Sequence, residues 1–290
     1  MAVKSGIEEI KALYPFKSNY LDVGAGQMHF VDEGVGNPIL MVHGNPTWSF
    51  YYRNLAKEFC ATNRVVVPDH LGCGLSDVPS DYEYTLENRI KDLTTLVKFL
   101  DLKNITLVVH DWGGAIGMGF ATRYPELIDR VVILNTAAFR SERIPFRISL
   151  CKNKLFGDFL VRYFNGFAWP ATFMTTKKKL STKIKKGYLM PYQDPKHRKA
   201  VSEFVRDIPM NEKHRSYETL KEIEEKLPRL GCPKLILWGG RDFCFNDEFF
   251  ARWKNIYPDS FHKYYKDAGH YILEDEGEDV KKQIEAFMES

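Results

Sequence analysis

Short apolar segments with strand-like patterns alternate with stretches of helical periodicity in both the first and the last part of this 290-residue chain. Most are continuous runs of valine, isoleucine and leucine bounded by glycine, aspartate or proline, which are typical of parallel strands covered on both faces. Candidate strands lie at positions 28–32, 38–42, 64–68, 105–109, 131–134, 234–238 and 261–265. Helices are expected at 49–59, 86–100, 115–124 and 279–288. The alternation predicts an α/β fold with a doubly wound, mostly parallel sheet.

One long segment, 138–215, interrupts this alternation. It shows no buried strand, and its helical stretches carry many large apolar residues, among them Phe156, Phe164 and Trp169. We therefore expect three parts: a first core segment at 1–137, a helical insertion at 138–215, and a second core segment at 216–290. The apolar residues suit either a lining for alkyl chains or ordinary packing. Six lysines at 177–186 are interpreted as a solvated helix face.

Composition excludes several classes of protein. The net charge of +3, from 41 basic and 38 acidic residues, is too small to indicate a nucleic-acid partner. No run of 18 apolar residues predicts a membrane span, and the first residues do not resemble a secretory signal. Five scattered cysteines without a paired spacing indicate reduced thiols rather than a zinc site. We expect a cytoplasmic protein that needs no metal and no organic cofactor.

The segment 108–115 reads Val-Val-His-Asp-Trp-Gly-Gly-Ala, a strand that ends at polar residues before paired glycines open a helix. This is the strand–turn–helix context of a nucleophile elbow, with Asp111 at the position of the nucleophile. A carboxylate there can displace a leaving group from carbon and form an ester. The alternative is that Asp111 only caps the helix.

Two hydrogen-bond donors are expected beside Asp111. The segment 41–49 ends a strand in a glycine-containing turn that includes Asn45, and Trp112 follows the elbow directly. The amide of Asn45 and the indole N–H of Trp112 could together hold a departing anion without adding charge. Taken singly, Asn45 could be a turn residue and Trp112 a core aromatic.

An acid and a base follow later in the chain. Asp242 comes after the candidate strand at 234–238, and His270 after the one at 261–265, in the order nucleophile, acid, base. His270 would activate water against the Asp111 ester while Asp242 orients the imidazole. Asp247 is a possible competitor of Asp242. His43 and His110, which lie near the site, are interpreted as structural.

These motifs resemble the haloalkane dehalogenase family of α/β-hydrolases over nearly the whole chain: His-Gly-Asn-Pro-Thr-Trp-Ser at 43–49, Pro-Asp-His-Leu-Gly-Cys-Gly-Leu-Ser at 68–76, His-Asp-Trp-Gly-Gly at 110–114 and Gly-His at 269–270. The resemblance implies an eight-stranded core with a helical cap. It also implies Asp111 as nucleophile, His270 as base, and Asn45 with Trp112 as halide binders. Asn135 stands where one branch of the family has its acidic glutamate, so Asp242 should be the acid, as in the third subfamily.

Two further segments, 135–139 and 204–209, are similar to the β-lactone decarboxylases of bacterial long-chain olefin biosynthesis. Those enzymes share the dehalogenase scaffold but open a four-membered lactone and release carbon dioxide, leaving an alkene. We predict dehalogenation, in which Asp111 displaces halide and His270-activated water hydrolyses the ester, with β-lactone decarboxylation as the alternative. The expected partners are a small hydrophobic substrate, either a halogenated alkane or a dialkyl β-lactone, and a halide ion.

Three other functions are weighed against these. Epoxide hydrolases also use an aspartate elbow but need cap tyrosines, for which Tyr163, Tyr188 and Tyr192 are candidates. Serine esterases are disfavoured because no serine occupies the elbow. The last alternative is a receptor that binds a ligand without turnover.

Overall fold

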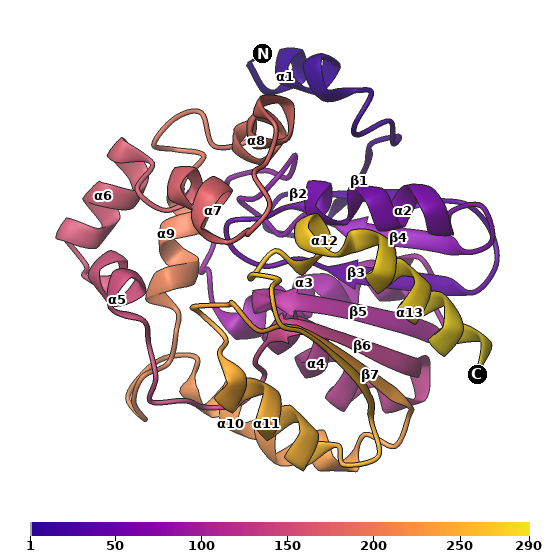
Figure 1. Cartoon of the computed structure of the whole chain (residues 1–290). Helices are drawn as coiled ribbons and strands as arrows, with labels where there is room; N and C mark the ends of the chain where they lie inside the picture. Colours follow the sequence, from indigo (N-terminus) through magenta and orange to yellow (C-terminus); the bar gives the residue numbers. More distant parts are fainter. Residues whose placement is uncertain (1) are drawn as a thin grey trace.

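The computed structural model describes residues 2–290, with side chains from residue 6 onward. Its strands form one eight-stranded sheet in the order β1-β2-β4-β3-β5-β6-β7-β8 (Figure 1). The strands are β1 (Asn19–Asp22), β2 (Gln27–Glu33), β3 (Pro38–Val42), β4 (Arg64–Pro68), β5 (Ile105–Asp111), β6 (Ile128–Thr136), β7 (Lys234–Gly239) and β8 (Phe261–Tyr265). β2 pairs antiparallel with β1 on one side and with β4 on the other, and all other neighbouring strands pair parallel. The predicted α/β fold is confirmed.

The central strands are buried on both faces, because their side chains pack alternately into two separate hydrophobic clusters. Val109 and Ile133 point to one cluster, and their neighbours Val108 and Val132 to the other. This follows from the two-residue period of a strand, which sends successive side chains to opposite faces. Every residue of β5 is buried. The end of β5 is therefore held rigidly from both sides.

Helices cover both faces of the sheet. In the first and last parts of the chain they are α1 (Ala2–Ile10), α2 (Arg53–Phe59), α3 (Leu86–Phe99), α4 (Trp112–Arg123), α10 (Tyr217–Lys226), α11 (Asp247–Ile256), α12 (Ile272–Asp275) and α13 (Gly277–Glu289). Residues of α3, α4, α10 and α11 share one cluster with the strands, and residues of α2 and α13 share the other. Figure 1 shows α13 and α4 on opposite sides of the sheet.

Between β6 and α10 the described chain forms helices and loops, as expected for 138–215. The helices are α5 (Phe146–Lys152), α6 (Phe156–Phe164), α7 (Ala168–Met174), α8 (Thr182–Leu189) and α9 (Lys199–Arg206). They have a small hydrophobic cluster of their own, which includes Val161, Tyr192 and Val201. In Figure 1 they lie together beside the end of the sheet from which α4 starts. We call residues 138–215 the helical insertion; its exact bounds as a domain stay a prediction.

Several local expectations differ from the structure. The expected helix at 49–59 is a 3-10 turn at Ser49–Tyr52 followed by α2. α4 begins at Trp112 rather than at 115, because the paired glycines are packed into the helix. The sequence pattern does not predict β1, because β1 is a half-exposed strand at the sheet edge. No helix in the described part of the chain is long and apolar enough to cross a membrane.

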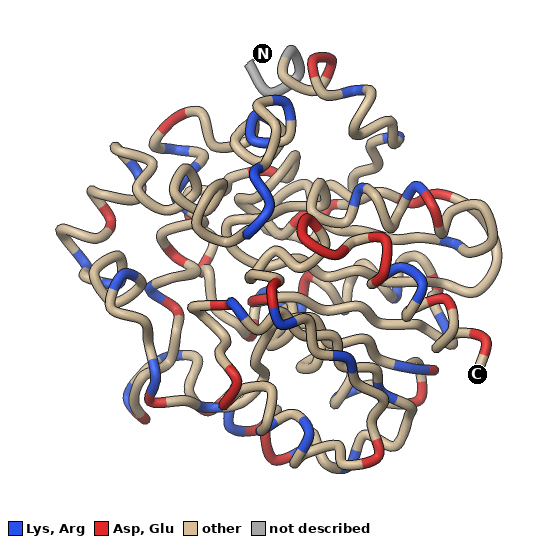
Figure 2. The backbone as a smooth tube through the Cα atoms, viewed as in Figure 1, with Lys and Arg blue, Asp and Glu red and all other residues tan. Residues whose placement is uncertain are grey.

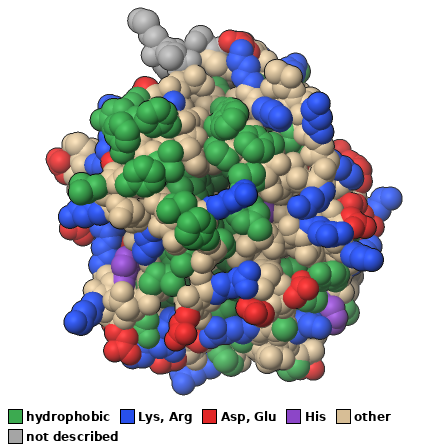
Figure 3. All heavy atoms as spheres, turned by 60° about the vertical axis from the view of Figure 1, so that its left-hand side comes forward, with side chains coloured by type: hydrophobic (Ala, Val, Ile, Leu, Met, Phe, Trp, Pro, Cys, Tyr) green, Lys and Arg blue, Asp and Glu red, His purple; other side chains and the backbone are tan. Residues whose placement is uncertain are grey.

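The insertion also differs from its expected role. Some of its aromatic residues pack in hydrophobic clusters, but Phe156, Phe164 and Trp169 are more than half exposed, so they neither pack in a core nor line a cavity. Figure 3 shows hydrophobic side chains gathered on this face of the molecule. Of the six lysines at 177–186, three precede α8, so they do not form a single helix face (Figure 2).

Candidate active site

Asp111 lies at the junction of β5 and α4, where the backbone is strained. Its φ of 52° and ψ of −128° place it in a conformation that non-glycine residues rarely adopt. The turn is tight enough that a Cβ on Gly113 would overlap the carbonyl group of Val42 at the end of β3. The side chain of Asp111 makes no capping hydrogen bond to α4. The geometry is therefore that of an elbow that presents the carboxylate, and the helix-cap interpretation is wrong.

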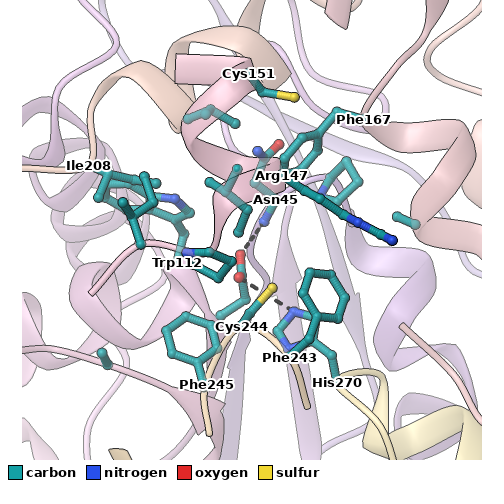
Figure 4. Close-up of a pocket in the computed structure, with 18 of the residues that line it drawn as sticks. Asn45, Trp112, Arg147, Cys151, Phe167, Ile208, Phe243, Cys244, Phe245 and His270 are labelled. Atoms are coloured by element: carbon teal, nitrogen blue, oxygen red, sulfur yellow. Dashed lines mark hydrogen bonds and ion pairs between the residues drawn. The ribbon is translucent and has the colours of Figure 1, made fainter. Parts of the chain in front are cut away.

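The carboxylate of Asp111 has a different environment at each oxygen. Oδ1 accepts a hydrogen bond of 2.6 Å from the backbone N–H of Asn45, which follows β3. Oδ2 lies 3.5 Å from Nε2 of His270. Figure 4 shows these two interactions as dashed lines. Oδ1 is thus held by a backbone donor, whereas Oδ2 faces the imidazole of His270.

The structure brings His270 and Asp242 together with Asp111. His270 follows β8, and its Nδ1 lies 2.7 Å from Oδ2 of Asp242, which follows β7. The backbone N–H of Cys244 donates to Oδ1 of Asp242 at 2.7 Å. Asp247 instead accepts from the hydroxyl of Tyr264 at 2.8 Å. The expectation that Asp242 rather than Asp247 meets the histidine agrees with this geometry.

Burial and charge set the protonation of this group. Burial alone would lower the pKa of His270, yet the neighbouring carboxylates of Asp242 and Asp111 raise it to about 10. Burial would raise the pKa of Asp111, but the hydrogen bond and charge of His270 and the N–H of Asn45 lower it overall. The surroundings of His270 therefore favour its protonated form at neutral pH.

The other two histidines near the site have contacts that fit a structural role. His43 faces the carbonyl of Gly44 with Nδ1 at 2.8 Å and accepts from the N–H of His70 with Nε2. His110 faces the carbonyl of His270 with Nε2 at 2.9 Å, and burial together with His270 lowers its pKa to about 3. Both rings brace the loops that carry the site.

Asn45 and Trp112 both line the cavity beside Asp111, as the sequence predicts (Figure 4). The amide of Asn45 donates one hydrogen bond, of 3.1 Å, to the carbonyl of Val201 in α9. One N–H of this amide therefore stays available. No described residue accepts a hydrogen bond from the indole of Trp112. Two free donors thus lie in the cavity with Asp111, although one N–H of the Asn45 amide is bonded to the insertion.

The cavity has a volume of about 380 Å³ and is mostly apolar. The core contributes Phe245 and Phe249, and the insertion contributes Phe139, Ile148, Leu160, Phe167 and Met174. No tyrosine lines it in the described part of the chain, and the hydroxyl groups of Tyr188 and Tyr192 bond to Glu274 and to the carbonyl of Thr47. The cap tyrosines that epoxide opening would need are therefore absent from this cavity.

Sequence reasoning missed some residues of the site. Phe243, Cys244 and Phe245 line the cavity from the loop after Asp242, and Arg147 reaches it from α5. No pattern marks them, because they belong to a loop and to a short helix. The sequence motifs mark Asn135 only by the absence of a glutamate. The available signal is that Asn135 lies near the end of one predicted strand and Asp242 follows another, which places both at the same edge of the sheet.

Residues 37–277 match the α/β hydrolase fold family. The chain belongs to that family. Among its relatives, the cis-3-alkyl-4-alkyloxetan-2-one decarboxylase of Shewanella oneidensis is 45% identical, over 96% of this chain and 90% of the relative. Haloalkane dehalogenase 2 of Mycobacterium tuberculosis is 30% identical, over 91% and 92%.

Solved structures give the same fold. The crystal structure of haloalkane dehalogenase DatA from Agrobacterium tumefaciens C58 superposes with a TM-score of 0.85 at 26% identity, covering 93% of this chain and 95% of that one. The predicted resemblance to haloalkane dehalogenases and β-lactone decarboxylases is confirmed. The roles of the individual site residues stay a prediction.

Proposed function

We propose that this protein is a cis-3-alkyl-4-alkyloxetan-2-one decarboxylase, which converts a dialkyl β-lactone into a cis-alkene and carbon dioxide. The observation that carries the choice is the 45% identity to such a decarboxylase over 96% of the chain, against 30% to a dehalogenase. The predicted alternative is thereby favoured over the dehalogenase that the sequence motifs put first. The apolar cavity, which Asp111 lines, suits the two alkyl chains and the strained ring of a dialkyl β-lactone.

The proposed first step is attack by Oδ2 of Asp111 on the ring carbon that bears the lactone oxygen. The C4–O bond breaks, its electron pair goes to the departing carboxylate, and an alkyl ester of Asp111 forms with inversion. The imidazolium of His270 and the free donors of Asn45 and Trp112 stabilise the carboxylate that is released. Relief of ring strain drives this step.

The second step regenerates the enzyme without water. The released carboxylate leaves as carbon dioxide, the C2–C3 electron pair becomes the new C3–C4 double bond, and the C4–O bond to Asp111 breaks. Backside attack has placed the Asp111 oxygen opposite the C2–C3 bond, so an anti elimination returns the cis geometry of the lactone. No proton is gained or lost overall. His270 therefore acts as a cation in this reaction rather than as a base.

Dehalogenation is the second candidate, favoured by the unpartnered indole N–H of Trp112 beside the amide of Asn45. Oδ2 of Asp111 would displace halide toward these donors. Esterification removes the charge of Asp111, which lowers the pKa of His270, so that the neutral imidazole can deprotonate a water. That water attacks the ester carbonyl while the N–H of Asn45 stabilises the oxyanion at Oδ1. A cytoplasmic location remains a prediction for either enzyme.

The test is a direct comparison of substrates. Purified protein is incubated with a cis-3,4-dialkyl β-lactone, its trans isomer and 1-bromohexane, and alkene, carbon dioxide and bromide are measured together. We expect alkene from the cis lactone at a rate at least tenfold above bromide release. Asp111→Asn should abolish both reactions, and Asp247→Asn is the matched control. Bromide without alkene would show that the protein is a dehalogenase and not a decarboxylase. Turnover by Asp111→Asn would show that Asp111 is not the nucleophile in either mechanism.

A further inference from the structure

The helical insertion exposes an apolar surface that the proposed chemistry does not use. Six of its large apolar side chains are 57% to 82% exposed: Phe146, Leu155, Phe156, Tyr163, Phe164 and Trp169. None of the six lines the cavity. Nine of the fourteen exposed large apolar residues in the described chain fall between 146 and 173. Contiguous exposed apolar surface of this kind marks an interaction site. We call these six residues the apolar patch.

Charge is divided unevenly between the insertion and the rest of the chain. The insertion has 18 Lys and Arg but only 6 Asp and Glu, a net charge of +12. The remaining residues have 23 basic and 32 acidic side chains, a net charge of −9. The overall charge of +3 conceals this division. Figure 3 shows basic side chains around the hydrophobic ones on the face that the insertion presents.

Many of these cations are free. No described carboxylate lies within 4.0 Å of the ammonium groups of Lys154, Lys179 or Lys183, although other basic residues of the insertion are paired. Lys154 is adjacent in sequence to Leu155, one of the most exposed residues of the apolar patch. An exposed apolar patch on a segment that also carries unpaired cations matches a layer of anionic head groups above acyl chains.

From these observations we propose that the helical insertion docks the protein peripherally on an anionic lipid bilayer, with the apolar patch entering the head-group boundary. A second copy of the chain is a less suitable partner for the patch, because contact between two insertions would bring together two segments that each have a net charge of +12. A nucleic acid would use the cations but would leave the aliphatic and phenyl groups unburied. The bilayer is the partner that satisfies both features.

Docking would also place the cavity against the lipid. Arg147 and Leu150 of α5 line the cavity and are themselves exposed, so the cavity opens on the face that carries the apolar patch. On the proposed function, the substrate is a dialkyl lactone that partitions into membranes, and this orientation would let it enter from the bilayer. This last step rests on the proposed function, whereas the docking itself rests only on the surface.

The experiment is co-sedimentation of the full chain with vesicles of phosphatidylglycerol and phosphatidylcholine, or of phosphatidylcholine alone. We expect binding to the anionic vesicles at least tenfold stronger than to the neutral ones, and weakened by salt. The triple variant Leu155→Gln, Phe156→Gln and Phe164→Gln should reduce binding at least tenfold. The matched control changes exposed apolar residues of the core: Val35→Gln, Phe99→Gln and Phe261→Gln.

A second pair of variants tests the charges. Lys154→Glu, Lys179→Glu and Lys183→Glu together should abolish the preference for anionic vesicles, whereas Lys91→Glu, Lys103→Glu and Lys266→Glu should leave it intact. The proposal would be overturned if vesicle binding fell equally in the insertion variants and the core variants. It would also be overturned if the wild type did not sediment with anionic vesicles. A dimer seen by light scattering that only the apolar triple variant dissociates would also overturn it, since a second copy would then cover the patch.

Folding and catalysis are checked separately. Circular dichroism establishes that each variant is folded, and turnover of a short-chain, water-soluble β-lactone should be unchanged in all of them. Vesicle binding by a protein without lactone activity would support docking and contradict the proposed function. Lactone turnover by a protein that does not bind vesicles would support the proposed function and contradict docking.

Discussion

Asn135 donates a hydrogen bond of 3.0 Å from Nδ2 to Oδ2 of Asp242, the carboxylate oxygen that also faces Nδ1 of His270. The same side chain accepts from the N–H of Gly239 at 2.7 Å through Oδ1, so its orientation is fixed at both ends. Asn135 thus ties β6 to the end of β7. The residue that stands in place of a glutamate thus contacts the proposed acid, Asp242, through a hydrogen bond.

Asn135→Asp is the substitution that tests this relationship. Aspartate tolerates the positive φ of 29° at this position but removes the donor and adds a second carboxylate beside Asp242. A hydrogen bond to a charged group contributes about 1.5–3 kcal/mol, so we expect kcat to fall roughly 10- to 100-fold. The added charge should also raise the pKa of His270, which moves the basic limb of the pH–rate profile upward. Wild-type kcat with an unmoved profile would show that Asn135 does not position Asp242.

The core was more predictable from the sequence than the site environment. The candidate strands at 105–109 and 234–238 are predictable because buried parallel strands need continuous apolar runs, and these runs place Asp111 and Asp242 at the same edge of the sheet, at the ends of β5 and β7 on either side of β6. β1 is not predictable in this way, because a half-exposed strand at the sheet edge has no continuous apolar run. The bond from Asn45 to Val201 could not be foreseen, since no periodicity relates the insertion to the loop after β3.

The stability of the protein should depend on pH through His270 and Asp111. Because the folded state raises the pKa of His270 to about 10, its contribution is complete below the ordinary value of about 6.5 and is lost as the pH rises through 10. The lowered pKa of Asp111 acts in the opposite sense, with stability lost as the pH falls below its ordinary range. The pair therefore stabilises most between about pH 4 and 6.5.

Urea unfolding at pH 6, 8 and 10 measures this dependence. We expect the free energy of unfolding of the wild type to fall across that range. Asp111→Asn should fall less steeply, because His270 keeps only Asp242 as a charged partner. Asp247→Asn, which removes a carboxylate outside the site, should follow the wild-type slope. A parallel slope for Asp111→Asn would mean that Asp111 does not hold the proton on His270.

Labelled water separates the two candidate reactions at the level of Asp111. Hydrolysis of an alkyl ester by attack on its carbonyl carbon puts an oxygen of water into the Asp111 carboxylate, whereas decarboxylative elimination returns the original oxygen. After several turnovers of the cis lactone in H₂¹⁸O, the peptide that contains Asp111 should show no gain in mass. Turnover of 1-bromohexane, where it occurs, should label the same peptide. Label after lactone turnover would show that the ester is hydrolysed.

The indole of Trp112 should report anion binding. Its N–H has no acceptor in the described structure and it lines the cavity beside Asp111, so chloride or bromide should bind there and quench part of the tryptophan fluorescence in a saturable way. Trp112→Phe keeps an aromatic ring but lacks the donor, and it should remove the saturable component. Trp169→Phe is the matched control, because Trp169 is exposed on α7 and outside the cavity. A saturable response that persists in Trp112→Phe and disappears in Trp169→Phe would place the anion site on the surface of the insertion instead.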